Sequence, residues 1–507
     1  MSSKVFSAAI IGLDCEVVEV EADNSPHGQP GIHIVGLPDK AVDESKSRVY
    51  SAVRNVGLDF PRGNVTVNLA PADLKKVGTY YDLPIAVACL DQNSEINLAT
   101  WRENSLFVGE LALNGDLRPV NGVLSIALMC QQRAIANIFL PRANAAEAAL
   151  VAGVTVYPLD NLRQLYEHLK GVAIINRFVG ADIWHQSVAA AGFDMAFIKG
   201  QEQAKRALEI AAAGGHNILM SGPPGSGKTM LAKAMASILP QLTIEESLEV
   251  TKIHSAAGIL PKDQPLLTSR PFRSPHHTAS AVALVGGGSW PRPGEISLAH
   301  RGVLFLDEFL EFPKTVLENL RQPLEDGLVT VSRAAGTIKF PAKFILVAAM
   351  NPCPCGYLSD PDKDCLCSPG QIINYQKRAS GPLLDRIDIH IEVPRLNFDK
   401  LEAGPAGESS VQIRQRVQAA RDIQLARFKE DKIISNAEIN SQQIEKYCRL
   451  DDSGRQLLRQ AVDKFHLSAR SFHRILKLAR TIADLAEQEN ILVEHLAESL
   501  QYRPQID

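Results

Sequence analysis

Residues 222–229 form a complete phosphate-binding loop of the type G-x-x-x-x-G-K-[ST], and they read Gly222-Pro223-Pro224-Gly225-Ser226-Gly227-Lys228-Thr229. A short strand-like run, 217–220, precedes the loop and a helix-like run, 229–235, follows it. The motif requires this strand–loop–helix setting. The glycines allow backbone N–H groups to converge on phosphate oxygens at a helix N-terminus. We expect Lys228 to contact the β- and γ-phosphates and Thr229 to bind Mg²⁺.

Two further strands are predicted to complete this site. The apolar run 303–306 is typical of a buried parallel strand, and Asp307 and Glu308 follow it directly. An aspartate at such a strand end can hold Mg²⁺ through water, and the adjacent glutamate can polarise the attacking water. A third run, 344–350, ends at Asn351, whose amide is expected beside the γ-phosphate. The order of the three elements is typical of an AAA+ ATPase that uses ATP and Mg²⁺.

The length of 507 residues favours several domains, at about 150 residues each. Residues 1–171 alternate strand-like runs with helices and predict an α/β domain, followed by a linker, 172–192. We place the α/β ATPase core, with its parallel sheet, at 193–393. Residues 394–507 have helical periodicity and predict an all-α lid.

Composition excludes several classes of protein. With 45% hydrophobic and 22% charged residues the chain is typical of a globular protein. Its apolar runs are far shorter than the roughly 20 residues needed to cross a membrane, and the N-terminus lacks a signal-peptide pattern. We therefore expect a cytoplasmic protein without a membrane partner. A net charge of −4 argues against a charge-driven nucleic-acid binder but allows a ring enzyme with a basic pore.

Four of the eight cysteines cluster in an insertion of the core, 352–368. They are arranged as two C-x-C pairs: Cys353, Cys355, Cys365 and Cys367. Four thiolates are a plausible tetrahedral site for structural Zn²⁺ and leave no open position for catalysis. The C-x-C spacing is tighter than the usual C-x₂₋₄-C, so free or redox-active thiols remain the alternative.

Ring ATPases need a positive charge from a neighbouring subunit in the transition state, and arginine suits this role because it keeps its proton. Arg386 lies just before an apolar strand and is our candidate for this trans-acting finger. A structural ion pair with Asp385 or Asp388 is the alternative. In the lid, a helix beginning near 468 is expected to aim Arg470 back at the phosphates, with Arg474, one turn further on, as a second candidate.

Several long motifs carry a resemblance to a known family. They are Arg273-Ser274-Pro275-His276-His277-Thr278, Pro293-Gly294-Glu295-Ile296, Ala299-His300-Arg301-Gly302, Asn351-Pro352-Cys353-Pro354-Cys355-Gly356 and Leu383-Leu384-Asp385-Arg386. With these motifs the chain resembles the ComM/YifB-like family of magnesium-chelatase-like AAA+ ATPases over nearly its whole length. The resemblance implies a homohexameric motor in the clade of the minichromosome-maintenance helicases. It also implies ATP-driven unwinding and branch migration of DNA during recombination in natural transformation, with single-stranded or branched DNA as the partner.

By similarity to that clade, two segments are expected to project into the pore. The first is 273–297, which contains His276 and His277; their roles stay open between structural hydrogen bonds and contacts with DNA or the γ-phosphate. The second is 328–338, whose alternation and glycine-containing turn predict a β-hairpin independently of the family. Arg333 near its tip is suited to a DNA phosphate, and a solvated turn residue is the alternative.

Residues 1–171 resemble the Lon-protease fold, which raises a rival function as an ATP-dependent protease. The positions of the Lon serine and lysine carry Tyr80 and Leu124 here. Without a Ser–Lys pair there is no activated nucleophile, so a non-catalytic domain is expected. A chelatase-type ATPase and a protein remodeller without DNA activity remain as alternatives to the DNA motor.

Overall fold

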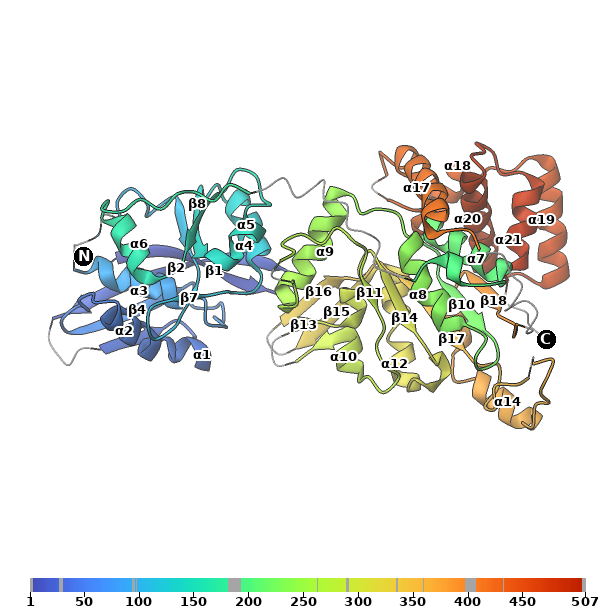
Figure 1. Ribbon diagram of the computed structural model, residues 1–507, viewed down its shortest axis with the longest axis horizontal. Coiled ribbons are helices and arrows are strands. Elements are labelled where there is room, and N and C mark those ends of the chain that lie inside the picture. Colours follow the sequence, from blue (N-terminus) through green and yellow to red (C-terminus); the bar gives the residue numbers. More distant parts are fainter. Residues whose placement is uncertain are drawn as a thin grey trace. The chain divides into compact units, whose positions relative to one another are not determined.

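The computed structural model forms two compact units (Figure 1). The first unit comprises Met1–Gln186 with Ser247–Leu267, and the second comprises Ser187–Glu246 with Thr268–Asp507. The structure describes residues 3–26, 31–93, 96, 98–180, 193–261, 263–288, 291–333, 336–358, 360–396, 407–431 and 433–503. The second part of the expected linker, 181–192, and residues 397–406 of the expected lid therefore lie outside the described residues.

A mixed seven-stranded sheet, in the order β3-β4-β2-β1-β5-β8-β9, organises the first unit. The pairs β1–β2 and β2–β4 are antiparallel, and the other neighbours are parallel. The strands are β1 (Ser3–Ile11), β2 (Asp14–Ser25), β3 (Gly31–Val35), β4 (Asn64–Ala70), β5 (Ser105–Phe107), β8 (Asn137–Pro141) and β9 (Thr155–Leu159), with a small ribbon of β6 (Glu110–Leu111) and β7 (Leu117–Arg118).

Two hydrophobic cores lie on opposite faces of this sheet, because successive side chains of a strand point to opposite sides. Val5 of β1 belongs to the core that contains α2 and α3, and Ala8 belongs to the core that contains α4 and α5. The helices of the unit are α1 (Lys40–Asp43), α2 (Ser45–Asn55), α3 (Asp82–Asp91), α4 (Val123–Gln132), α5 (Ala145–Ala148) and α6 (Leu162–Leu169), with a 3₁₀ turn at Arg142–Asn144.

The first unit is completed by a distant segment of the chain, Ser247–Leu267, which includes most of α9 (Ile244–Ala257). Leu248 packs against the core beneath α4. The Ser255 hydroxyl donates to Glu147, and the Ser255 carbonyl accepts from the Gly122 N–H at 3.2 Å. The C-terminal part of α9 is thus built into the first unit by apolar and polar contacts.

The sheet of the second unit is entirely parallel and has the order β11-β14-β17-β10-β18. Its strands are β11 (Phe272–Arg273), β14 (Val303–Leu306), β17 (Ile345–Met350), β10 (Ile218–Ser221) and β18 (Ile389–Glu392). The runs predicted at 303–306 and 344–350 are confirmed as strands, and the predicted α/β class with a parallel ATPase sheet is confirmed. Their apolar character follows from burial of both faces of a parallel sheet.

Helices surround this sheet and continue into a C-terminal bundle, drawn from orange to red in Figure 1. Two short ribbons complete the unit: β12 (Gly286–Gly287) with β13 (Arg292–Pro293), and β15 (Leu328–Arg333) with β16 (Gly336–Pro341). The helices are α7 (Glu202–Gly214), α8 (Lys228–Ile238), α10 (Ala281–Val285), α11 (Glu295–Leu298), α12 (Lys314–Glu318), α13 (Arg321–Asp326), α14 (Pro369–Gln376), α15 (Gly381–Leu384), α17 (Ser410–Arg427), α18 (Ser441–Tyr447), α19 (Asp452–Phe465), α20 (Ala469–Leu485) and α21 (Val493–Gln501). Single 3₁₀ turns are Met195–Phe197, Phe309–Glu311 and Asn436–Glu438. Within the described residues, no helix combines the length and apolar character needed to cross a membrane.

The C-terminal bundle shares a hydrophobic core with the ATPase sheet, and a buried charge network holds its own helices together. Leu478 and Ile482 of α20 pack into the core formed by α7, α8 and the sheet. Asp484, whose side chain is fully buried, pairs with Arg427 of α17 at 2.8 Å and with Arg480 at 2.9 Å. It also accepts from the Asn436 amide at 2.8 Å. One carboxylate therefore holds α17, α20 and the turn between them.

Replacing Asp484 with alanine is expected to destabilise this bundle by about 3–5 kcal/mol, because the buried guanidinium group of Arg480 and the partly buried one of Arg427 lose their counter-charge. Hydrogen exchange of the α17 and α20 amides measures the local free energy of opening. Asp452→Ala is the matched control, since its fully exposed carboxylate should change that free energy by no more than about 0.5 kcal/mol. Equal protection in the two variants would contradict the assigned role of Asp484.

Candidate ATP site

The parallel register of three strands brings the predicted ATP-site residues to one edge of the sheet. Ser221 of β10 lies opposite Met350 of β17, and Leu306 of β14 lies opposite Ala348. The residues that follow these strands are therefore neighbours at the carboxyl edge, where α/β sheets bind their ligands. The phosphate-binding loop, Asp307–Glu308 and Asn351 meet there.

The phosphate-binding loop has the conformation that its glycines predict. Gly225 and Gly227 have φ of 79° and 93°, in the left-handed region, and a Cβ at either would meet no atom within 4 Å. The space beside both glycines is open. Ser226 is buried, and its hydroxyl has no hydrogen-bond partner among the described residues. A phosphate group fits this cradle, since it supplies the acceptor that the hydroxyl lacks.

Lys228 is held within the loop by backbone carbonyls. Its Nζ donates to the carbonyl oxygens of Gly222 at 2.7 Å and Pro223 at 2.9 Å, and it lies 3.4 Å from Asn351 Oδ1. Burial lowers the pKa of the Lys228 ammonium, because the charged form loses its hydration. A bound phosphate would offset that loss with negative charge. The contact with Asn351 places the predicted sensor amide beside the predicted phosphate-binding lysine.

Thr229 and Asp307 are already in contact at the position expected for Mg²⁺. The Thr229 hydroxyl donates to Asp307 Oδ2 at 2.7 Å, and both residues are at least partly exposed. A hydroxyl and a carboxylate are hard oxygen ligands of the kind that Mg²⁺ accepts alongside water and phosphate oxygens. The donor set therefore fits the ion that this class of site uses.

Glu308 lies next to Asp307 in an unusual backbone conformation and has a partner that the sequence did not reveal. Its φ of 51° is in the left-handed region, which costs a residue other than glycine about 1–3 kcal/mol. Its side chain is 56% exposed, and one carboxylate oxygen lies 2.9 Å from Nδ1 of His277. This contact allows His277 to orient the predicted base. His276 instead contacts the Thr278 hydroxyl at 2.9 Å.

Arg386 and Arg470 meet at one acidic residue, Glu325 of α13. Arg386 forms an ion pair with Glu325, and Arg470 lies 3.2 Å from the other carboxylate oxygen. Arg386 holds the pKa of that carboxyl below its ordinary value by its hydrogen bond. Arg386 therefore has an intrachain partner that the sequence did not predict, while the described residues show no ion pair with the expected alternatives, Asp385 and Asp388.

These arginines line a cavity of about 470 Å³ at the amino edge of the sheet. Asn217, Gly302 and Asp388, which immediately precede β10, β14 and β18, line the same cavity. The phosphate-binding loop lies at the opposite, carboxyl edge. Helix α20 directs Arg470 to Glu325 here, and its expected role at the phosphates stays a prediction. Arg474 lines the cavity as well and donates to the Ile387 carbonyl.

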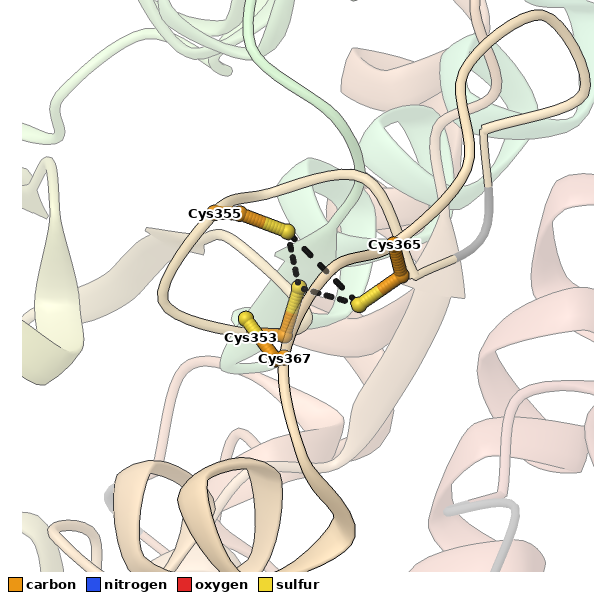
Figure 2. Close-up of side chains that lie close together, drawn as sticks. All are labelled: Cys353, Cys355, Cys365 and Cys367. Carbon is orange, nitrogen blue, oxygen red and sulfur yellow. Dashed lines mark hydrogen bonds between the residues drawn. The ribbon is translucent and has the colours of Figure 1, made fainter.

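The four clustered cysteines lie together between β17 and α14 (Figure 2). The Sγ atom of Cys353 lies 3.4 Å from that of Cys355 and 3.6 Å from that of Cys365, and Cys355 and Cys365 are 3.6 Å apart. All four sulfur atoms, including that of Cys367, lie within 4.8 Å of one another. The set can hold one metal ion.

The hairpin predicted at 328–338 is present as β15 and β16, which extend it to Pro341. Arg333 pairs with Gly336 in the register and ends β15 beside the turn. The side chain of Arg333 and residues 334–335 lie outside the described residues, so the contact proposed for Arg333 is an expectation from the sequence alone.

In the first unit, the positions of the Lon serine and lysine hold side chains without that chemistry. The Tyr80 hydroxyl accepts from the Ile10 N–H at 3.4 Å, and its ring packs on Tyr81 with centroids 4.6 Å apart. Leu124 is fully buried in α4. These two positions therefore serve packing and provide no nucleophile and base.

Comparison with known proteins relates the whole chain to one family. The family models that match are "Magnesium chelatase, subunit ChlI" at residues 194–401, "Subunit ChlI of Mg-chelatase" at 18–144 and "Magnesium chelatase, subunit ChlI C-terminal" at 407–503. The chain is 44% identical over 512 residues to the competence protein ComM of Haemophilus influenzae, covering 99% of this chain and 97% of ComM. It is 42% identical over 502 residues to YifB, an uncharacterised protein of Escherichia coli, covering 99% and 97%. An uncharacterised protein of Mycobacterium tuberculosis is 43% identical over 504 residues, covering 99% and 98%.

His277→Ala is expected to lower the rate constant of ATP hydrolysis about tenfold, because Glu308 loses the contact that orients its carboxylate. This is less than the hundredfold or more by which a general base contributes. Nucleotide affinity, measured by the anisotropy of a fluorescent ATP analogue, should stay within about twofold because Lys228 is unchanged. His276→Ala is the control, since its ring contacts Thr278 and not Glu308. Equal hydrolysis rates in the two variants would reject the role of His277.

Proposed function

Because the chain belongs to the ComM- and YifB-like family of magnesium-chelatase-like AAA+ proteins, we propose that it is an ATP-driven DNA motor. It assembles as a homohexamer, binds single-stranded or branched DNA, and unwinds or branch-migrates it during recombination in natural transformation. The observation that carries the proposal is the meeting of the phosphate-binding loop, Asp307–Glu308 and Asn351 at one sheet edge, in a chain that matches a competence protein from end to end.

Each residue of the site has a defined task in hydrolysis. Lys228 binds the phosphates, and the Glu308 carboxylate accepts a proton from the attacking water. His277 holds that carboxylate in place. Thr229 and Asp307 would hold Mg²⁺, which would supply positive charge to the phosphate oxygens. Asn351, next to Lys228, is placed to sense the γ-phosphate.

The remaining positive charge comes from a neighbouring subunit. Arg386 and Arg470 lie at the amino edge of the sheet, away from the phosphate-binding loop of their own chain. In a head-to-tail ring, the amino edge of one subunit faces the nucleotide of the next, and Glu325 holds both arginines until that contact forms. This arrangement supports action in trans, with Arg386 as the finger.

A subunit-mixing experiment tests the trans arrangement. Arg386→Ala and Glu308→Gln should each abolish steady-state hydrolysis, while Glu308→Gln still binds ATP. In an equimolar mixture, about a quarter of the interfaces join an intact base to an intact finger, so activity should reappear. The control mixes Glu308→Gln with Lys228→Ala. Both residues act on the nucleotide bound by their own subunit, so every site in this mixture keeps one defect and activity should not reappear. A mixture that stays at background, or normal hydrolysis by Arg386→Ala alone, places the finger elsewhere.

The DNA-binding part of the proposal is tested on the β15–β16 hairpin. Arg333 is proposed to contact phosphate and not base edges, because a translocating enzyme must accept any sequence. Arg333→Ala should weaken binding of forked DNA equally for all sequences. The slope of the logarithm of the binding constant against the logarithm of salt concentration should become shallower by about one per subunit engaged. DNA-stimulated ATP hydrolysis and branch migration should fall together, while basal hydrolysis stays within about twofold, since the hairpin lies apart from the nucleotide.

Arg455→Ala provides the matched control, since it removes the same charge from an exposed position on α19. Branch migration unchanged in Arg333→Ala would remove Arg333 from the DNA path. A parent protein with neither DNA binding nor DNA-stimulated hydrolysis would reject the motor itself. Protein remodelling or chelatase-type activity would then take its place.

A further inference from the structure

The cysteine cluster has the dimensions of a site for a single metal ion. Around a tetrahedral ion with Zn–S bonds of about 2.3 Å, neighbouring sulfur atoms are about 3.8 Å apart. The pairs formed by Cys353, Cys355 and Cys365 are separated by 3.4–3.6 Å. A disulfide would need about 2.05 Å between sulfur atoms. Four thiolates around one ion leave no open position, which is the arrangement of a structural zinc site.

The loop that carries the cluster has no regular secondary structure and buries few of its apolar side chains. Residues 352–358 and 360–368 form no helix or strand, and the leucines of this segment do not enter a core. Leu366 is 90% exposed and Leu358 is 44% exposed. A segment that buries so little apolar surface needs a cross-link to keep one conformation, and a metal bound by four side chains supplies it.

The same loop contacts the phosphate-binding loop directly. Cys353 follows Asn351 by two residues, and Asn351 lies 3.4 Å from the ammonium of Lys228. Gly356 has a φ of 85° and packs so closely on Pro224 that a Cβ there would lie 2.6 Å from the proline ring. The first C-x-C pair is therefore attached to Asn351 on one side and rests on the phosphate-binding loop on the other.

The second C-x-C pair is linked to the catalytic glutamate by α14. Ser368, next to Cys367, begins this helix with a capping box. Just after the helix, Arg378 donates to the Leu310 carbonyl at 3.1 Å and pairs with Glu311 at 2.8 Å. These residues form the turn directly after Glu308. The cluster thus lies between elements that end at Asn351, Pro224 and the Glu308 turn.

We propose that Cys353, Cys355, Cys365 and Cys367 bind one zinc ion, and that this zinc positions the ATP site. Without it, Asn351 and the turn after Glu308 lose their common anchor, and nucleotide binding and hydrolysis decline together. The positioning role rests on the proposed ATP hydrolysis, whereas the zinc site itself does not.

The test compares Cys367→Ser with Cys367→His in the full-length protein. Histidine is a zinc ligand and serine is a poor one, so only the serine variant should lose the metal. The parent and Cys367→His should contain one zinc per chain by elemental analysis. Cobalt substitution should give the absorption of a tetrahedral thiolate site, strongest in the parent. Cys15→Ser, a thiol of the first unit outside the cluster, is the control and should match the parent in metal and activity.

We expect zinc loss to lower kcat/KM for ATP by about 10- to 100-fold, the range seen when the surroundings of a functional site are disturbed. Parent protein stripped with a thiol-specific mercurial and a chelator should show the same loss and recover when zinc is returned. This reversible arm keeps the result independent of whether Cys367→Ser folds.

Three results would overturn the inference. The first is a parent with far less than one zinc per chain and four freely titrating thiols. The second is stripped protein that binds and hydrolyses ATP as the parent does. The third is a Cys367→His variant that keeps zinc but is as inactive as Cys367→Ser. If the zinc-loaded parent binds ATP without hydrolysing it, the proposed function fails instead, and the zinc dependence of nucleotide affinity then decides the inference.

Discussion

The parallel pairing of β14, β17 and β10 is the constraint on which the rest of the second unit depends. Each strand is apolar and largely buried, and polar residues follow all three at the same edge of the sheet. A loop, a carboxylate pair and an amide that lie far apart in the sequence become neighbours only because these strands run in the same direction. A shift in the register of β17 would separate Asn351 from Lys228 and turn the cysteine loop away from Pro224.

The same pairing gives the sheet two chemically different edges. At the carboxyl edge, backbone N–H groups and a buried lysine provide a place for an anion. At the amino edge, guanidinium groups gather around Glu325 beside a cavity. The two groups of charges are separated by the length of the strands, which lets one chain hold both without mutual repulsion between Lys228 and Arg386.

The sequence predicted the parts of the site whose chemistry is local. The loop 222–229 and the strand ends at Asp307 and Asn351 are recognisable because motif and flanking run are contiguous. The contact of His277 with Glu308 and that of Arg386 with Glu325 were not predictable, because no short-range signal joins a loop residue to a partner 31 or 61 positions away. The position of Arg470 was not predictable for a related reason: it is set by the packing of Leu478 and Ile482 on the ATPase core. A helical pattern shows which face is apolar, but not where that face docks.

The contribution of α9 to the first unit has a practical consequence for dissecting this protein. The helix follows α8 in the chain, yet Leu248, Ser255 and the residues to Leu267 are packed with β-strands and helices from the N-terminal part. Cutting the chain near residue 186 would strip Leu248 of its apolar neighbours and leave the Ser255 hydroxyl without Glu147. The shortened product would expose apolar surface on α9, which is the second helix after the phosphate-binding loop in the chain. Such a fragment could lose activity because α9 is no longer packed, and not only because a function of the N-terminal part is missing.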